Sequence, residues 1–446
     1  MKIKFKKMLL IGVAPMAMAG VAIAAISCGQ GKTDRAQIIN LTETITGITG
    51  STIETAANKV LTDNIANLKT FHIGIFTAGG AVTDKSFNQS SYEAAVLLNN
   101  KIVELNPDAK ISVTPHDEPA SDDTSLGNTY TAGLKNGENI WVLSGFQHGS
   151  AFANWYKIAS NKASFDAAKI TVIGIDWSAD PAVAPGRIIT LNYKTQEAGY
   201  IAGYASGKYL AETYPSDASK RVLATFGGAE FPGVTDFIDG YLAGAAKWNS
   251  ENPTLKSTWY AKGVRLDTGF NPSVQENSTK VRGVVNAASK PQLIFSVSGP
   301  FTGTVIETIT ANNSEAKVIG VDADQSLSFA ASRNLFFSSV TKNIGLSLYQ
   351  VLAPLAVGFY TDELIKISGF VDGTTNGALK EGVSRDFVGV TKTYLPSAAD
   401  QVAQAALDAG RAKFLADAAA SGGITYAQKG TAEEVFFYVD FIKANF

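Results

Sequence analysis

Cysteine and histidine are scarce in this sequence, and their scarcity removes whole classes of functional site. Cys28 is the only cysteine, and three histidines occur among 446 residues. One thiol cannot form an internal disulfide, and three separated imidazoles provide no cluster with the ligand spacing of a zinc site or a thiol-dependent catalytic centre. We therefore predict no catalytic residue, no metal ion and no cofactor. The scarcity of cysteine and histidine does not exclude a metal site built from carboxylates alone.

An excess of charge of either sign is also missing. The chain has 38 basic and 40 acidic residues, and no long run of like charge is visible. Because nucleic-acid binding needs a basic surface that neutralises phosphates, we expect no nucleic-acid partner. With 45% hydrophobic and 17% charged residues the composition is that of a globular protein. The length indicates roughly two or three domains of about 150 residues.

The N-terminal region has the pattern of a secretory signal. Four lysines among the first seven residues precede an apolar run from Met8 to Ile26 that ends in small residues before Cys28. The letters AAIS before Cys28 resemble a bacterial lipobox, which implies a signal peptide over 1–27 and acyl chains on Cys28. The alternative is an uncleaved anchor, since the run approaches the roughly 20 residues that span a bilayer. Either way, we expect an extracytoplasmic protein held at the cell membrane, with 28–68 as its tether.

Short apolar runs, each followed by a polar loop and a helix-like segment, fill most of the remaining chain. Repetition of strand, loop and helix predicts parallel sheets with right-handed crossovers. The runs fit two doubly wound lobes better than one large sheet. We expect strands at 73–76, 110–114, 140–143, 169–175, 187–193, 222–226, 256–260, 293–297, 317–321 and 336–340. Short helices are expected over 54–61 and 92–105, and a Gly/Ala-rich helix over 196–212 should pack closely on a neighbour.

Doubly wound lobes also occur in dinucleotide-dependent enzymes, but the motifs of those enzymes are missing. No G-x-G-x-x-G follows a first strand, and no G-x-x-x-x-G-K-[ST] is present. There is also no G-x-S-x-G nucleophile elbow. The sequence therefore predicts a protein that is not an enzyme.

The stretch from Phe71 to Glu93 holds the first candidate binding groups. An apolar strand leads into a Gly-rich loop that carries Asp84, Phe87 and Asn88. In parallel α/β sheets, ligands bind at the carboxyl ends of the strands. An aromatic ring beside a carboxylate and an amide suits a ligand with both a ring and hydroxyl groups. The alternative is an ordinary turn in which Asp84 is solvated, Phe87 lies in the core and Asn88 caps the next helix.

Five segments give the chain a family resemblance over about residues 69–395. They are, in order, GGAVTDKSFNQSSYEAA, QEAGYIAGYASG, FPGVTDFIDGYLAGA, VIGVDADQS and SSVTKN. The ordered set resembles the basic membrane protein family, bacterial lipoproteins that deliver solutes, including purine nucleosides, to ABC transporters. The tail after about residue 398 matches nothing in that family.

The resemblance implies a type I periplasmic-binding-protein fold, in which a hinge of three strands joins two α/β lobes that close over a ligand. On this basis we assign 69–190 and 341–365 to an N-terminal lobe. The C-terminal lobe is then expected to consist of 191–340 and 366–446.

The resemblance also implies roles for individual residues. Phe87 and Phe270, from opposite lobes, would sandwich the base, and Asn88 and Asp176 would face its nitrogen atoms.

At the other end of the ligand, Asp322 and Lys342 would hold the ribose hydroxyls, with Asp84 and Gly299 as secondary candidates. A carboxylate can accept hydrogen bonds from two adjacent hydroxyls, and a neighbouring lysine keeps it ionised.

We therefore expect a monomeric receptor that captures a nucleoside, purine in type, and passes it unchanged to the permease of an ABC transporter. Two rival functions stay open. Sugars also stack on aromatic rings, so the ligand could be a sugar or another polar metabolite. The N-terminal tether and the unassigned tail leave room for a surface adhesin or antigen, whereas a nucleoside hydrolase has the least support.

Overall fold

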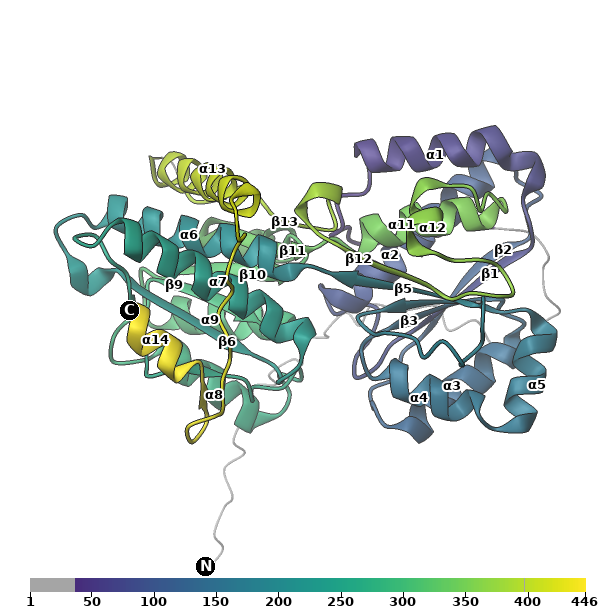
Figure 1. The fold of residues 1–446 in the computed structure, drawn as a ribbon, viewed down its shortest axis with the longest axis horizontal. Helices are drawn as coiled ribbons and strands as arrows, with labels where there is room; N and C mark the ends of the chain where they lie inside the picture. The colour runs from purple at the N-terminus through teal and green to yellow at the C-terminus, as the bar shows by residue number, and fades with distance from the viewer. Residues whose placement is uncertain (1–36, 397) are drawn as a thin grey trace, which may run out of the picture. The chain divides into compact units, whose positions relative to one another are not determined.

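The structure is a computed structural model that describes residues 37–396 and 398–446 (Figure 1). The predicted signal peptide over 1–27 and the predicted lipidation site Cys28 lie outside these residues. No helix in the described chain is both long and apolar enough to cross a lipid bilayer.

The first lobe is built on a sheet of six parallel strands in the order β12-β5-β4-β3-β1-β2. Its strands are β1 (Phe71–Phe76), β2 (Ile111–His116), β3 (Ile140–Ser144), β4 (Thr171–Ile175), β5 (Ile188–Tyr193) and β12 (Gly377–Glu381). One face is covered by α1 (Thr52–Asn64), α2 (Phe87–Leu105), α11 (Ile344–Ala356) and α12 (Glu363–Ser368). The opposite face carries α3 (Asp123–Asn136), α4 (His148–Tyr156) and α5 (Ala159–Ala168) (Figure 1).

The second lobe is built on an eight-stranded sheet that is parallel except for two antiparallel strands, β13 and β14. Its order is β13-β11-β10-β9-β6-β8-β14, and β7 also pairs with β6. The strands are β6 (Val222–Gly227), β7 (Thr258–Trp259), β8 (Val264–Arg265), β9 (Leu293–Val297), β10 (Lys317–Asp322), β11 (Phe336–Lys342), β13 (Val388–Val390) and β14 (Phe436–Phe437). Its helices are α6 (Thr195–Thr213), α7 (Pro232–Glu251), α8 (Gln275–Val285), α9 (Thr302–Ala311), α10 (Gln325–Ser328), α13 (Ala398–Ala419) and α14 (Val439–Asn445).

Within the described residues, the chain passes between the lobes three times. The passages lie between β5 and α6, between β11 and α11, and between β12 and β13. This arrangement of two parallel α/β lobes confirms the predicted fold class. It also directs the carboxyl ends of strands from both sheets toward one region between the lobes.

Three predicted boundaries differ from the structure, and the first is residue 190, because β5 of the first lobe continues to Tyr193. We placed 366–446 in the second lobe, but α12 and β12 belong to the first, where β12 pairs with β5. β12 is an edge strand with alternating burial, so it lacks the continuous apolar run that marked the other strands. We also predicted that the chain returns to the first lobe at residue 341, whereas β11 of the second lobe extends through Lys342.

The predicted tether is wrong for its described part, because residues 37–64 pack on the first lobe. Residues 39–48, which we call the N-terminal strap, lie along α2, and α1 packs on α11. The buried Glu93 carboxylate of α2 accepts hydrogen bonds from the backbone N–H groups of Ile45 (2.7 Å) and Thr46 (3.3 Å). Ile48 and Leu61 are fully buried.

Close packing of the Gly/Ala-rich helix is confirmed. α6 packs against α7, and the pairing has no room for side chains at Gly203 and Gly240. A Cβ atom at Gly203 would collide with the carbonyl of Tyr241, and one at Gly240 would collide with the carbonyl of Gln196.

The tail continues the second lobe. α13 packs on α6, and an extended stretch then crosses α7 before reaching β14 and α14, shown in yellow in Figure 1.

Candidate functional site

A cavity of about 520 Å³ lies where the strand ends of the two lobes meet. Both lobes contribute to its lining. All eight residues that the sequence nominated are among the lining residues: Asp84, Phe87, Asn88, Asp176, Phe270, Gly299, Asp322 and Lys342. The structure therefore brings these residues together, while their roles in binding stay predictions.

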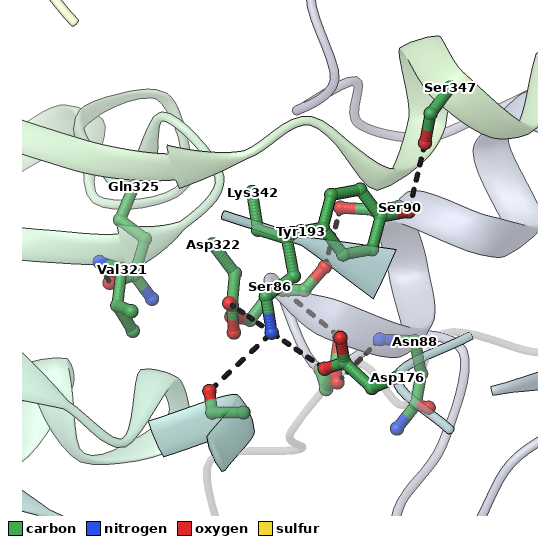
Figure 2. A network of polar contacts seen from close by, with 12 residues as sticks. Ser86, Asn88, Ser90, Asp176, Tyr193, Val321, Asp322, Gln325, Lys342 and Ser347 are labelled. Atoms are coloured by element: carbon green, nitrogen blue, oxygen red, sulfur yellow. Dashed lines mark hydrogen bonds and ion pairs between the residues drawn. The ribbon is translucent and has the colours of Figure 1, made fainter. Parts of the chain in front are cut away.

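The most buried charge of the cavity belongs to Lys342, whose side chain is 2% exposed. Its Nζ atom lies 2.6 Å from Oδ2 of Asp176 and 3.9 Å from Oδ1 of Asp322, and it donates to the carbonyl oxygen of Gly233 at 3.5 Å (Figure 2). Lys342 ends β11 of the second lobe, whereas Asp176 follows β4 of the first. The ion pair thus bridges the lobes. We expected Lys342 beside Asp322, and the structure places it closer to Asp176.

Burial and neighbouring charges set the protonation of this cluster. Burial raises the pKa of Asp322 to about 6; Asp176 and Asp84 add to this rise, and Lys342 opposes it. Burial alone would lower the pKa of Lys342, but the carboxylates of Asp176 and Asp322 outweigh it, so this pKa lies above its usual value. Lys342 is therefore a permanent cation, while Asp322 changes charge near pH 6.

Aromatic faces surround the same ammonium group. Lys342 Nζ lies 5.4 Å from the ring centroid of Phe87, 5.8 Å from that of Tyr193 and 5.1 Å from that of Phe237. Such cation–π contacts favour the charged lysine in a site with little water. Phe87 is thereby placed next to the charged cluster.

Asp176 and Asp322 share an unusual backbone conformation. Asp176 follows β4 and Asp322 is the last residue of β10, and each has φ of 65°, in the left-handed region. Aspartate tolerates this region better than most residues. The sharp turn away from the strand lets both carboxylates line the cavity.

Asp84 anchors the start of α2. Its carboxylate accepts hydrogen bonds from the backbone N–H groups of Ser86 (2.9 Å), Asn88 (2.9 Å) and Gln89 (3.0 Å). Burial raises the pKa of Asp84, although these hydrogen bonds lower it. The cap explains why α2 begins at Phe87 and not near Tyr92, as we predicted. It also shows that Asp84, and not Asn88, caps this helix.

Gly299 permits a close approach of the two lobes. A Cβ atom at this position would collide with the side chain of Ser86 from the first lobe. Ser86 Oγ in turn donates to Oδ2 of Asp322 at 3.3 Å. Glycine is therefore required here by packing between the lobes, whatever its role toward a ligand.

Sequence reasoning missed three further aromatic residues of the lining, Phe237 and the pair Phe146 and Phe231. Phe231 lies 6.5 Å from Phe270 between ring centroids, with the planes at 61°. Phe146, from the first lobe, lies 3.9 Å from Phe231. Their position directly after the strands at 140–143 and 222–226 was the available signal.

Solved structures with a similar fold support the architecture. An ABC transporter solute-binding protein from Aeropyrum pernix K1 superimposes with a TM-score of 0.55 at 14% identity, covering 84% of this chain and 85% of that one. A solute-binding protein from Conexibacter woesei DSM 14684 gives 0.50 at 16% identity, covering 82% and 99%. A transcriptional activator of the comK gene from Bacillus halodurans gives 0.50 at 14% identity, covering 79% and 99%. At these identities the likeness shows the fold alone.

Sequence comparison supplies the family. No curated protein sequence shows a significant match to this chain. The family model described as "ABC transporter substrate-binding protein PnrA-like" (Bmp) matches residues 72–358, which is more than half of the chain, and confirms the resemblance to the basic membrane protein family. The chain therefore belongs to the PnrA-like family of ABC transporter substrate-binding proteins.

Proposed function

We propose that this protein captures a nucleoside, purine in type, in the cavity between its lobes and delivers it to the permease of an ABC transporter. The observation that carries the proposal is that two kinds of surface, one aromatic and one charged, line the same cavity. Aromatic rings of Phe87, Phe231 and Phe270 occur in the same cavity as a buried cluster of carboxylates and one ammonium group. A nucleoside has a flat base and a ring of vicinal hydroxyls, which match these two kinds of surface.

The charges of the lining argue for an unphosphorylated ligand. Asp84, Asp176 and Asp322 bring three carboxylates, and Lys342 is the only cation among the lining residues. That cation is already paired with Asp176. A phosphate group would enter an excess of negative charge with no free cation to receive it, so we expect a nucleoside to bind and its monophosphate to be rejected.

Binding would proceed by closure of the lobes. Phe87 and Phe270 would stack on the base, each contact adding roughly 0.5–1.5 kcal/mol beyond the buried area. Asn88 would meet the base edge, and Asp322 would accept hydrogen bonds from ribose hydroxyls. A ligand that contacts both lobes favours the closed form, and the permease would read that form.

The site assignment is tested by calorimetry on purified protein. Wild type is titrated with inosine, guanosine, adenosine and a panel of hexoses. We expect Phe87→Ala and Asp322→Asn to weaken nucleoside binding about tenfold each, while both variants stay folded. Asp63→Asn, a matched change at an exposed aspartate on α1, should bind as wild type does. Unchanged affinity in both site variants would defeat the assignment, and binding of hexoses alone would favour a sugar receptor.

The membrane anchor needs a separate test. We propose that Cys28 carries the lipid that holds the protein on the outer face of the cell membrane. Mass spectrometry of the protein extracted from the membrane fraction should then find Cys28 as the N-terminal residue, carrying acyl chains. A chain that still begins at Met1 and carries no acyl chain would favour the uncleaved anchor instead.

A further inference from the structure

Two phenylalanine rings join the lobes at the rim of the cavity. Phe146 follows β3 in the first lobe, and Phe231 is the residue before α7 in the second. Their ring centroids lie 3.9 Å apart, with the planes tilted by 31°, so the faces of the rings are in direct contact. Both rings line the cavity, yet Phe146 is 39% exposed. The contact therefore lies where the cavity meets the solvent.

The backbone on each side is shaped to present these rings. Gly145 has φ of 128°, a conformation that side chains rarely permit, and it turns the chain sharply at the end of β3 so that Phe146 projects. On the other side, a Cβ atom at Gly233 would collide with the ring of Phe231. Each phenylalanine thus depends on a glycine beside it for its position.

The aromatic contact is continuous with the rest of the site. Phe231 also packs edge-to-face on Phe270, which the proposed function assigns to base stacking. The carbonyl of Gly233 accepts a hydrogen bond from Lys342, whose ion pair with Asp176 also bridges the lobes. The ion pair is buried, whereas the rings meet at the edge of the solvent. Opening of the lobes must separate the two rings, and their separation exposes two apolar faces to water.

We propose that Phe146 and Phe231 form an aromatic clasp that favours the closed form and sets the rate at which ligand leaves. The two rings meet only when the lobes close. In the open form they are apart and do not obstruct the entry of the ligand. Its loss should speed dissociation and leave association nearly unchanged. The effect on dissociation rests on the proposed function, whereas the effect on closure does not.

The first experiment uses the ligand-free protein. Small-angle X-ray scattering of wild type, Phe146→Ala, Phe231→Ala and the double variant should show a larger radius of gyration in all three variants. Because both single changes break the same contact between the lobes, the double variant should resemble Phe231→Ala, which also loses the contact with Phe270. Phe146→Tyr keeps the ring and should behave as wild type. Ile158→Ala, a change at another exposed apolar residue of the first lobe (54% exposed), is the matched control and should have no effect.

The second experiment measures binding kinetics by stopped flow with the nucleoside that binds wild type. We expect the dissociation rate to rise roughly two- to tenfold in Phe146→Ala and Phe231→Ala, with association rates within about twofold of wild type. Unchanged scattering and unchanged dissociation, or effects that add in the double variant, would overturn the clasp. If wild type binds no nucleoside, the proposed function fails, and the scattering of the ligand-free variants still decides whether the clasp exists.

Discussion

The replacement Lys342→Met tests how far the buried charge cluster supports the fold. Methionine keeps an unbranched apolar stem of similar length but removes the ammonium group that lies 2.6 Å from Asp176 and 3.9 Å from Asp322. The two carboxylates would then share a buried site with no cation. Breaking a buried pair by removal of one partner typically costs about 3–5 kcal/mol, and we expect a loss of folding free energy of this size at pH 7.5.

The loss should shrink at lower pH. Burial already raises the pKa of Asp322 to about 6 in the presence of Lys342, and removal of the cation raises this pKa further. Above pH 6, Asp322 is then protonated in the folded variant but ionised in folded wild type and in the unfolded chains. A folded state that binds more protons gains stability as pH falls, so the cost should decrease by about 2 kcal/mol between pH 7.5 and pH 5.

Urea denaturation followed by circular dichroism at the two pH values measures both effects. The double variant Asp176→Asn/Lys342→Met removes one of the two carboxylates that Lys342 contacts and should be more stable than Lys342→Met at pH 7.5. A cost below about 1 kcal/mol at pH 7.5, or one that is equal at both pH values, would refute the reasoning.

Three further predictions concern other parts of the molecule. If ionised Asp322 accepts the ligand hydroxyls, nucleoside affinity measured by calorimetry should fall roughly tenfold from pH 7.5 to pH 5, since its pKa is about 6. Gly203→Ala should lower stability toward urea by about 1–3 kcal/mol by forcing α6 from α7, whereas Gly283→Ala on α8, where a Cβ atom meets nothing within 4 Å, should not destabilise. Glu93→Ala should cost about 1–3 kcal/mol and expose the N-terminal strap to proteolysis, detected by mass spectrometry, because it leaves backbone N–H groups of the strap unpaired.

The sequence was most informative where strands are buried on both faces. Strands such as β3 and β9 show as mainly apolar runs, and their predicted positions agree with the structure to within one or two residues. β12 alternates between buried and exposed residues at a sheet edge, and β8 and β14 are only two residues long. Such strands depend on long-range pairing, which leaves no local pattern.

The N-terminal strap is a second segment whose structure depends on long-range contacts and not on a local sequence pattern. Its residues have no hydrophobic period, and its order comes from partners on α2 more than 40 positions away, such as Glu93 and Asn100. The local composition of this segment, rich in Thr, Ile, Asn and Gly, therefore led us to predict a tether. The start of α2 was missed for a related reason, because its capping carboxylate belongs to Asp84, two residues before the N-cap residue Ser86.

The family resemblance nominated eight residues that all line one cavity, but the rule that ligands bind at strand ends could not rank the three carboxylates among them. Their partners in the structure do so. The oxygens of Asp84 accept three backbone N–H groups, and Asp176 is held by Lys342 at 2.6 Å. Asp322 has only a hydroxyl at 3.3 Å and the same lysine at 3.9 Å among its described partners. Its described contacts are the longest of the three, and since Lys342 lies closer to Asp176, hydroxyl recognition in this cavity should depend more on Asp322 than on the lysine.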